Sequence, residues 1–480
     1  MRIAPTGFRE YDARWRYPGE IDLDGMAALG LGLGTQLHAA GVAPQIVTGH
    51  DYRAYSPAVK AALTEGLMRA GVTVHDIGLA LTPMAYFARH HLGVDAVAMV
   101  TASHNPNGWT GVKMGFTPPL THGPEEMAEL RDIVLGGRGV ARPGGRRIEA
   151  GGVRDAYIAD LVAAGPLARP LRAVCATGNG TAGAFAPEIL ARIGVEVVAL
   201  HTTLDHGFPN YNPNPEAMEM LADMGRAVRE SGADLGLGFD GDGDRCGVVD
   251  ADGREIFADK MGVLLARDYA RAHAPAAFVA DVKSTGLFAS DPVLRALGAT
   301  TDYWKTGHSH MKRRVRDLGA LAGFEKSGHY FLAPPIGRGY DCGMRAAVEI
   351  CRLLDRHAGM TLAALAGTLP RTWSTPTLSP ACPDAEKYAV LARIASRLEA
   401  LATAGGRLGG QPITGVLRVN GARVMLANGG WGLVRASSNT PNLVVVCESP
   451  ESEAEMRAIF RDLDAIIQEE PSIGAYDQSV

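Results

Sequence analysis

Hydrophobic residues along this chain occur in short runs, separated by segments whose apolar residues recur with the period of a helix. Three stretches repeat one order: an apolar run, a helical segment that ends at a glycine, and a second apolar run. The first runs cover residues 45–49, 172–177 and 278–282, the helices end at Gly71, Gly194 and Gly298, and the second runs cover residues 72–77, 195–200 and 299–304. A strand, a helix and a returning strand predict βαβ units, in which helices cover a sheet with parallel strands.

A third apolar run in each repeat leads directly into a polar loop. These runs cover residues 96–100, 235–239 and 318–324. Ligands of α/β proteins bind at the carboxyl ends of the strands, where these loops lie. Three loops in equivalent positions, each with a different set of polar side chains, therefore indicate one shared cleft.

The pattern changes after Asp384. Helical stripes are expected close to that residue (Leu391, Ile394, Leu398 and Leu401) and near the end of the chain (Met456, Ile459, Leu463 and Ile467), with strands at residues 416–419, 424–426, 431–434 and 443–446 between them. Helices that flank a series of neighbouring strands predict a smaller α+β domain.

Two stretches rich in glycine or proline (137–152 and 370–383) and a hairpin (250–258) mark the boundaries between domains. The sequence therefore predicts an α/β fold of four domains around a central cleft. Domains I (1–150), II (151–256) and III (257–371) are expected to be similar α/β units with mixed sheets, and domain IV (372–480) to be the smaller α+β domain. The length of 480 residues agrees with three or four domains of about 150 residues each.

Composition narrows the classes of partner. A net charge of −5 without a long lysine or arginine block argues against nucleic acid, and no apolar run approaches the ~18 residues of a membrane span. Charged residues at positions 2, 9, 10 and 12 argue against a signal peptide. The six cysteines are scattered, which argues against a disulfide framework or zinc ribbon and predicts a cytoplasmic protein.

The most specific motif is Asp240-Gly-Asp242-Gly-Asp244, directly after an apolar run. Three carboxylates at alternate positions of a glycine-rich loop can face one hard cation. A calcium EF-hand would need glycine and glutamate where Arg245 and Ala251 stand. The loop therefore predicts Mg²⁺ with a place left open for a phosphate oxygen; the alternative is an acidic surface turn.

The other loops are less specific when taken singly. Ser103 beside His104 could be a nucleophile or part of a turn, and Lys113 could act in proton transfer or be a solvated lysine. Glu325, Ser327 and His329 suit a polyol, or form a buried structural network. Arg435, Ser437, Ser438, Asn439 and Thr440 suit a phosphate dianion, or form a polar hairpin.

One motif is misleading. Residues 178–183 match the glycine fingerprint of dinucleotide-binding proteins, but His201-Thr202-Thr203 stands where the acidic residue is expected. A tight turn between a strand and a helix explains the glycines better than a nicotinamide site.

In this order, the loops at Thr101–Pro106, Asp240–Arg245, Glu325–His329 and Arg435–Ser437 resemble those of the α-D-phosphohexomutase superfamily, and in detail its phosphomannomutase/phosphoglucomutase branch. The resemblance implies a phosphoserine at Ser103, which also completes the Mg²⁺ site, and substrate contacts from the third and fourth loops. It implies further roles for Tyr11, Lys283 and His308 in substrate binding, and for Arg14, His104, Lys113 and Arg245 beside the transferred phosphate.

The activity implied is interconversion of a hexose 1-phosphate and a hexose 6-phosphate through a hexose 1,6-bisphosphate, with mannose and glucose as candidate sugars. Phosphoglucosamine mutase, a metal-dependent sugar phosphatase and a non-catalytic sugar-phosphate-binding paralogue are the alternatives. The expected partner is a small sugar phosphate, and the expected state is a monomer or a dimer.

The chain departs from the family at three places. Ala13 and Trp15 flank Arg14, Asn439 stands where threonine is common, and Phe324 replaces a usual glycine just before Glu325. The phenylalanine is expected to tilt the third loop.

Overall fold

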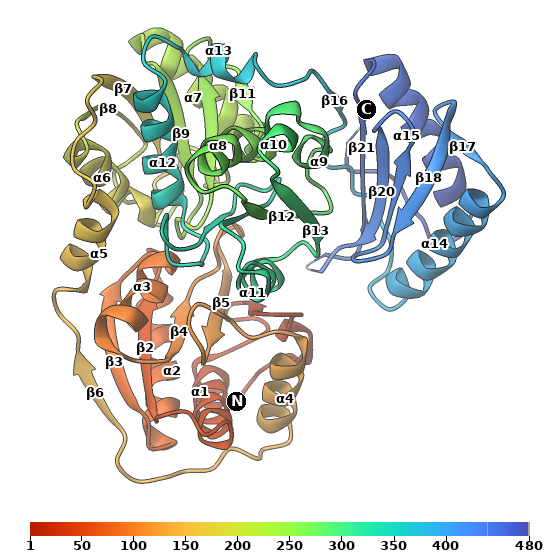
Figure 1. The fold of residues 1–480 in the computed structure, drawn as a ribbon. Coiled ribbons are helices and arrows are strands. Elements are labelled where there is room, and N and C mark those ends of the chain that lie inside the picture. The colour runs from red at the N-terminus through yellow and green to blue at the C-terminus, as the bar shows by residue number, and fades with distance from the viewer. Residues whose placement is uncertain (439, 479–480) are drawn as a thin grey trace.

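The computed structural model describes residues 1–438 and 440–478 and contains four sheets, one in each domain (Figure 1). Domain I has a six-stranded sheet in the order β1-β5-β4-β2-β3-β6, in which β2 is parallel to β3 and β4 while β5 is antiparallel to β4 and β1. Its elements are β1 (Ala13–Arg16), α1 (Leu23–Ala39), β2 (Gln45–His50), α2 (Ser56–Arg69), β3 (Thr73–Leu79), α3 (Thr82–Leu92), β4 (Ala96–Val100), β5 (Trp109–Gly115), α4 (Pro124–Leu135) and β6 (Arg146–Glu149).

Domain II has a five-stranded sheet in the order β11-β10-β9-β7-β8. Its elements are α5 (Val153–Val162), β7 (Leu171–Ala176), α6 (Ala186–Arg192), β8 (Val195–Leu200), α7 (Met218–Ser231), β9 (Leu235–Phe239), β10 (Cys246–Asp250) and β11 (Glu255–Ile256). The glycines of residues 178–183 form a tight turn after β7. A side chain at Gly183 would lie 2.1 Å from the carbonyl oxygen of Thr202.

Domain III has a four-stranded sheet in the order β13-β12-β14-β15. Its elements are α8 (Ala258–Ala272), β12 (Ala277–Asp281), α9 (Leu287–Ser290), α10 (Pro292–Ala296), β13 (Thr300–Trp304), α11 (His308–Leu318), β14 (Ala322–Phe324), β15 (Tyr330–Leu332), α12 (Gly343–Arg356) and α13 (Leu362–Ala366). The strand expected at 318–324 begins only at Ala322. The expected start was wrong because Leu318 ends α11 and Gly319 closes that helix in a left-handed conformation.

Domain IV has an antiparallel sheet in the order β16-β21-β20-β19-β18-β17, flanked by two helices. Its elements are β16 (Trp373–Ser374), α14 (Lys387–Thr403), β17 (Arg407–Leu408), β18 (Gln411–Leu417), β19 (Ala422–Leu426), β20 (Trp431–Ala436), β21 (Leu443–Ser449) and α15 (Glu453–Ile467). All four apolar residues predicted for the last helix are buried in this domain's core. The predicted architecture of three mixed-sheet α/β domains and a smaller α+β domain is confirmed.

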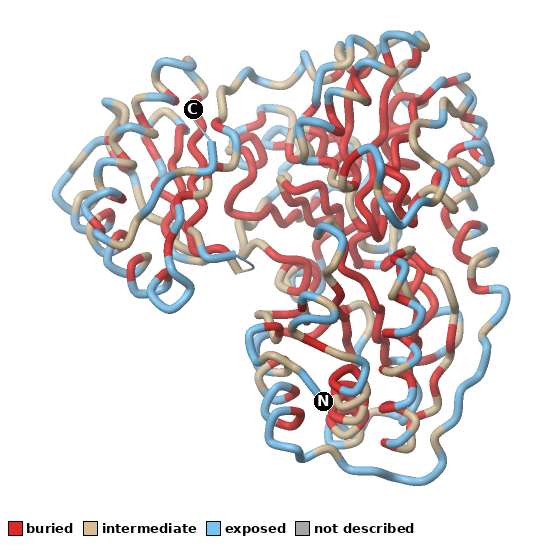
Figure 2. Tube along the Cα trace, turned by 180° about the vertical axis from the view of Figure 1, so that it is seen from behind, coloured by how far each residue is buried: buried red, intermediate tan, exposed pale blue. Residues whose placement is uncertain are grey.

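The cores show which domains are joined most closely. One hydrophobic cluster runs continuously through parts of domains I, II and III, whereas domain IV has a cluster of its own. Figure 2 shows buried chain through the centre of each domain and exposed chain between α4 and α5. Among the described residues, none of the helices has the length and apolar character that crossing a bilayer requires.

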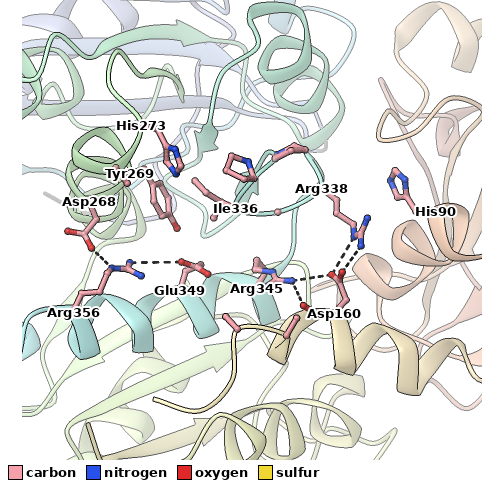
Figure 3. Close-up of a pocket in the computed structure, with 16 residues that line it drawn as sticks. His90, Asp160, Asp268, Tyr269, His273, Ile336, Arg338, Arg345, Glu349 and Arg356 are labelled. Atoms are coloured by element: carbon pink, nitrogen blue, oxygen red, sulfur yellow. Dashed lines mark hydrogen bonds and ion pairs between the residues drawn. The ribbon is translucent and has the colours of Figure 1, made fainter. Parts of the chain in front are cut away.

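Ion pairs at the start of α12 and in the loop before it also join domains II and III. They line a surface cavity of about 820 Å³ between these two domains, shown in Figure 3. Arg338 and Arg345 contact the Asp160 carboxylate of α5 at 2.5 and 3.1 Å. The same end of α12 lies against the aspartate loop, where the Gly343 amide donates to the carbonyl of Gly243. The helix therefore connects this cavity wall to the loop that carries the three aspartates.

Candidate active site

A polar cavity of about 180 Å³ lies where the four domains meet. The sequence-predicted residues that line it are Tyr11, Arg14, Ser103, His104, Lys113, Arg245, Lys283, His308, Glu325, Ser327, His329, Arg435, Ser437 and Ser438. Thr440 is exposed outside the lining, and Asn439 lies outside the described residues. The three aspartates lie fully buried beside the cavity.

The aspartate loop follows β9. Oxygens of Asp240, Asp242 and Asp244 lie within 4.8 Å of one another. One buried oxygen on Asp242 has no hydrogen-bond partner among the described residues, and Asp244 Oδ1 has only the long contact of 3.4 Å with His329 Nε2. Unpaired buried carboxylate oxygens are costly, so this donor set fits a hard cation such as Mg²⁺.

Lys113 of β5 reaches the same carboxylates. Its Nζ lies 2.8 Å from Asp242 Oδ2 and also contacts Asp244 Oδ2. Burial by itself lowers the pKa of Lys113, but the two carboxylates raise it above its usual value. Lys113 is therefore an ammonium ion that can hold or donate a proton at this position.

Ser103 lies in the loop after β4, in a left-handed backbone conformation with φ of 51°. Its Oγ donates to Asp240 Oδ2 at 2.9 Å and lies 3.1 Å from His104 Nδ1. The loop and the aspartates approach closely because Gly241 has no side chain: a Cβ there would lie 2.5 Å from the Ser103 carbonyl oxygen. The predicted nucleophile and the predicted metal loop are thus brought together across two domains.

Two buried residues that sequence reasoning missed hold this loop. The Arg53 guanidinium donates to the carbonyl oxygens of Ser103, Asn105 and Pro106 at 3.0, 2.6 and 3.0 Å. Asp51 accepts from the Ala102 amide at 3.1 Å and from the Arg53 Nε at 3.3 Å. They follow β2, and no motif marks them.

The cations near Ser103 determine the protonation of His104. Burial, followed by the charges of Arg245 and Arg14, lowers the pKa of His104 well below its usual value. His104 is therefore neutral beside Ser103. Arg14 pairs with Asp12 at 2.9 Å and Arg245 pairs with Glu216 at 3.0 Å.

The third loop carries an ion pair. His329 Nδ1 lies 2.8 Å from Glu325 Oε2, and Ser327 Oγ lies 3.1 Å from the same imidazole nitrogen. Burial alone lowers the pKa of His329, but Asp244 and Glu325 raise it to about 9. Glu325 Oε1 also accepts from the Gly307 amide at 2.5 Å. The loop is therefore a connected network that can also present oxygens to a ligand.

Phe324 does not displace this loop into the cavity. Its ring is fully buried on the far side of β14, 5.3 Å from the ring of Phe288. Gly262 of α8 provides the space, because a Cβ there would lie 2.8 Å from the Phe324 ring. The phenylalanine that departs from the family pattern is thus accommodated in the core.

The fourth loop forms the opposite side of the cavity. Arg435 lies near the end of β20, where its Nε donates to Asn420 Oδ1 at 3.0 Å. The hydroxyls of Ser437 and Thr440 lie 2.7 Å apart. Domain IV therefore contributes a guanidinium and serine hydroxyls to the cavity lining.

Tyr11 and His308 complete the lining between domains I and III. Their rings meet edge to face with centres 4.8 Å apart. Burial, with a smaller contribution from Lys312, lowers the pKa of His308 to about 4, so this imidazole is neutral. Asp12, Glu216 and Thr306 also line the cavity. Asp12 adjoins Tyr11 and Thr306 lies two residues before His308, but the sequence assigned none of the three a role.

Comparison with known proteins agrees with this geometry. Profiles described as phosphoglucomutase/phosphomannomutase domains I, II, III and C-terminal domain match residues 5–138, 155–253, 257–372 and 381–466. The chain belongs to the phosphoglucomutase/phosphomannomutase family. This confirms the predicted resemblance.

Members of this family match the chain along nearly its whole length. The phosphomannomutase/phosphoglucomutase of Pseudomonas putida is 34% identical over 94% of this chain and 93% of its own. A solved family protein from Burkholderia thailandensis is 31% identical, with a TM-score of 0.87 over 98% of this chain and 100% of that one. The prediction of an enzyme of the hexose-phosphate mutase class is confirmed.

A more distant structure shares the fold. It is an N-acetylphosphoglucosamine mutase from Aspergillus fumigatus, solved in complex with glucose 1,6-bisphosphate. It is 14% identical, with a TM-score of 0.59 over 96% of this chain and 95% of that one.

Proposed function

We propose that this protein moves a phosphoryl group between O1 and O6 of a hexose, mannose or glucose, with phosphorylated Ser103 as the donor and acceptor. The observation that carries the proposal is the position of Ser103 Oγ. It lies 2.9 Å from Asp240 at one side of a cavity whose other side holds Arg435 and the hydroxyls of domain IV. A group that transfers phosphate and a group that can hold a second phosphate therefore share one cavity.

The residues present fit the Mg²⁺ ion that the family implies. Asp240, Asp242 and Asp244 would hold it, and an oxygen of phosphorylated Ser103 would complete its ligands. When bound, Mg²⁺ supplies positive charge that stabilises the charge developing on the phosphoryl oxygens.

In the transfer step, the free hydroxyl oxygen of the sugar bonds to phosphorus as the bond from phosphorus to Ser103 Oγ breaks. The proton leaves the sugar hydroxyl and reaches the Ser103 Oγ. Lys113, with His104 3.1 Å from that oxygen, would carry the proton between the two oxygens, so neither residue keeps it at the end of the step. The product is a hexose 1,6-bisphosphate with unmodified Ser103.

The bisphosphate must then turn so that its other phosphate faces Ser103. Arg435 with Ser437 and Ser438 would bind whichever phosphate is not reacting. Glu325 and Ser327 would bind hydroxyls that both orientations present, while Tyr11, Lys283 and His308 line the space between. A cavity lined by four domains permits closure over the substrate, which would exclude the water that otherwise hydrolyses the phosphoserine.

The domain boundaries at residues 150, 256 and 371 are part of the proposal. The gaps between family matches at 139–154 and 254–256 contain the first two, and the third match ends at 372, one residue after the last. The six cysteines are buried and unpaired, which supports the predicted reducing, cytoplasmic surroundings.

The test is a ³¹P NMR time course with Mg²⁺ and a trace of the matching 1,6-bisphosphate. Mannose 1-phosphate, glucose 1-phosphate and glucosamine 1-phosphate are supplied separately. We expect conversion to the 6-phosphate without release of inorganic phosphate, and no conversion by Ser103→Ala. Release of inorganic phosphate alone would indicate a phosphatase. Preference for glucosamine 1-phosphate would mean that the substrate is an amino sugar and not mannose or glucose.

A further inference from the structure

The loop that carries Lys283 is held from outside its own domain. Lys283 follows β12 of domain III and lines the cavity. The Nη1 of Arg423, on β19 of domain IV, donates to the carbonyl oxygens of Val282 at 2.7 Å and Ser284 at 2.8 Å. Arg423 therefore binds the backbone on both sides of Lys283.

Arg423 itself is tightly packed. The residue is 3% exposed, and its guanidinium carbon lies 3.8 Å from the ring centre of Trp431 and 4.3 Å from that of Tyr303. Buried contact with two aromatic rings and two carbonyl groups uses both the flat faces and the N–H edge of the guanidinium. A lysine at this position could not make both kinds of contact together.

A second charged residue of domain IV holds the next part of the loop. Glu448 Oε1 accepts from the Gly286 amide at 2.7 Å, from Thr285 Oγ1 at 3.0 Å and from Trp431 Nε1 at 3.0 Å. The backbone from Val282 to Gly286 is thus fixed by a cation and an anion of domain IV, both packed against Trp431.

The turn that precedes Arg423 also supports Arg435. Asn420 accepts from Arg435 Nε, and Gly421 lies so close that a Cβ there would be 2.8 Å from the Arg435 Cα. The β18–β19 hairpin therefore supports two proposed substrate-binding residues. Its Arg423 holds the backbone beside Lys283 of domain III, and its Asn420 binds the side chain of Arg435 of domain IV.

We propose that Arg423 is a positioning residue for Lys283, and that the β18–β19 hairpin sets the places of Lys283 and Arg435 together. The proposal rests on the proposed function, in which these two cations bind the substrate. If Arg423 positions Lys283, the substrate contact made by Lys283 of domain III depends on the packing of domain IV against domain III. The reason is that Arg423, 140 positions later in the chain, belongs to domain IV.

The kinetic test uses Arg423→Gln and Arg423→Lys. Each should raise the KM for the sugar 1-phosphate about tenfold or more with a smaller change in kcat, because uniform binding by Lys283 is lost. In a Lys283→Ala background the same substitutions should change KM less than about twofold, because a positioning residue has no effect once its target is gone. Arg418→Gln is the matched control: Arg418 follows β18 in the same hairpin and pairs at the surface with Glu399.

Amide hydrogen exchange of residues 282–286 gives a readout that needs no activity. Arg423→Gln should speed exchange in this segment at least about tenfold, and Arg418→Gln should not. Unchanged exchange, or equal KM effects with and without Lys283, would overturn the proposal, as would failure of both Arg423 variants to fold. If the wild-type protein lacks mutase activity, the proposed function fails while the exchange measurement still decides the role of Arg423.

Discussion

The close approach of Gly241 to Ser103 leads to a quantitative prediction for Gly241→Ala. The added Cβ would lie 2.5 Å from the Ser103 carbonyl oxygen, about 0.9 Å less than the 3.4 Å at which ordinary contact begins. The backbone of Gly241 is outside the left-handed region, so the substitution acts through this clash alone. Because Arg53 already holds the same oxygen at 3.0 Å, the clash must separate the serine loop from the aspartates.

A displacement of roughly 1 Å between reacting groups can cost about 10²-fold in rate, or about 2.7 kcal/mol in the barrier. We therefore expect kcat for Gly241→Ala to fall about 100-fold, measured by ³¹P NMR with enzyme whose Ser103 phosphorylation is quantified by mass spectrometry. Gly151→Ala, where nothing lies within 4 Å of the new methyl group, is the matched control. A folded Gly241→Ala enzyme with kcat within about twofold of wild type would refute the reasoning.

Three further predictions concern the metal, the serine loop and acid stability. Chelation should abolish activity until Mg²⁺ is restored, and Asp242→Asn should weaken Mg²⁺ binding at least about tenfold by calorimetry; unchanged binding would place the metal elsewhere. Arg53→Met removes the donor of three carbonyls, of which that of Ser103 is buried, and the cation beside the buried Asp51 carboxylate. It should therefore lower the free energy of unfolding in urea by about 3 kcal/mol and kcat about tenfold, and wild-type values would contradict the assigned support. Burial lowers the pKa of His122 to about 4, below the 6.5 of a free histidine. The contribution of neutral His122 to the free energy of unfolding is therefore complete above pH 6.5. It is lost as the pH falls through 4, by on the order of 3 kcal/mol. Urea unfolding across this range should show a shallower decline in His122→Asn, and an equal decline would exclude His122 as the cause.

Much of the fold could be predicted from the sequence because its signals are local. The runs at 96–100, 195–200 and 235–239 match β4, β8 and β9 residue for residue, since each is apolar and ends at a polar loop. Position 318 was assigned to a strand because Leu318 is apolar and adjoins the next run. The periodicity of α11 and the left-handed glycine after it decide otherwise.

The candidate site divides in the same way. The aspartates, Ser103 and the third and fourth loops could be named because each is a short motif at the end of a strand. Arg53 and Glu216 could not, because their partners lie about 50 and 29 residues away and their neighbours in the chain form no pattern. The space that Gly262 leaves for Phe324 was equally invisible before the helix and the strand were packed together.

The sequence by itself determined the repeated α/β units, the separate C-terminal domain and the chemical groups available for phosphoryl transfer, because these depend on periodicity and on neighbours along the chain. Only the tertiary structure decided that Lys113 contacts two aspartates of another domain, that His329 reaches Asp244 of domain II, and that Arg423 holds the loop of Lys283. Those contacts depend on how far apart whole domains come to lie, and packing between domains sets that distance without leaving a periodic signal in the chain.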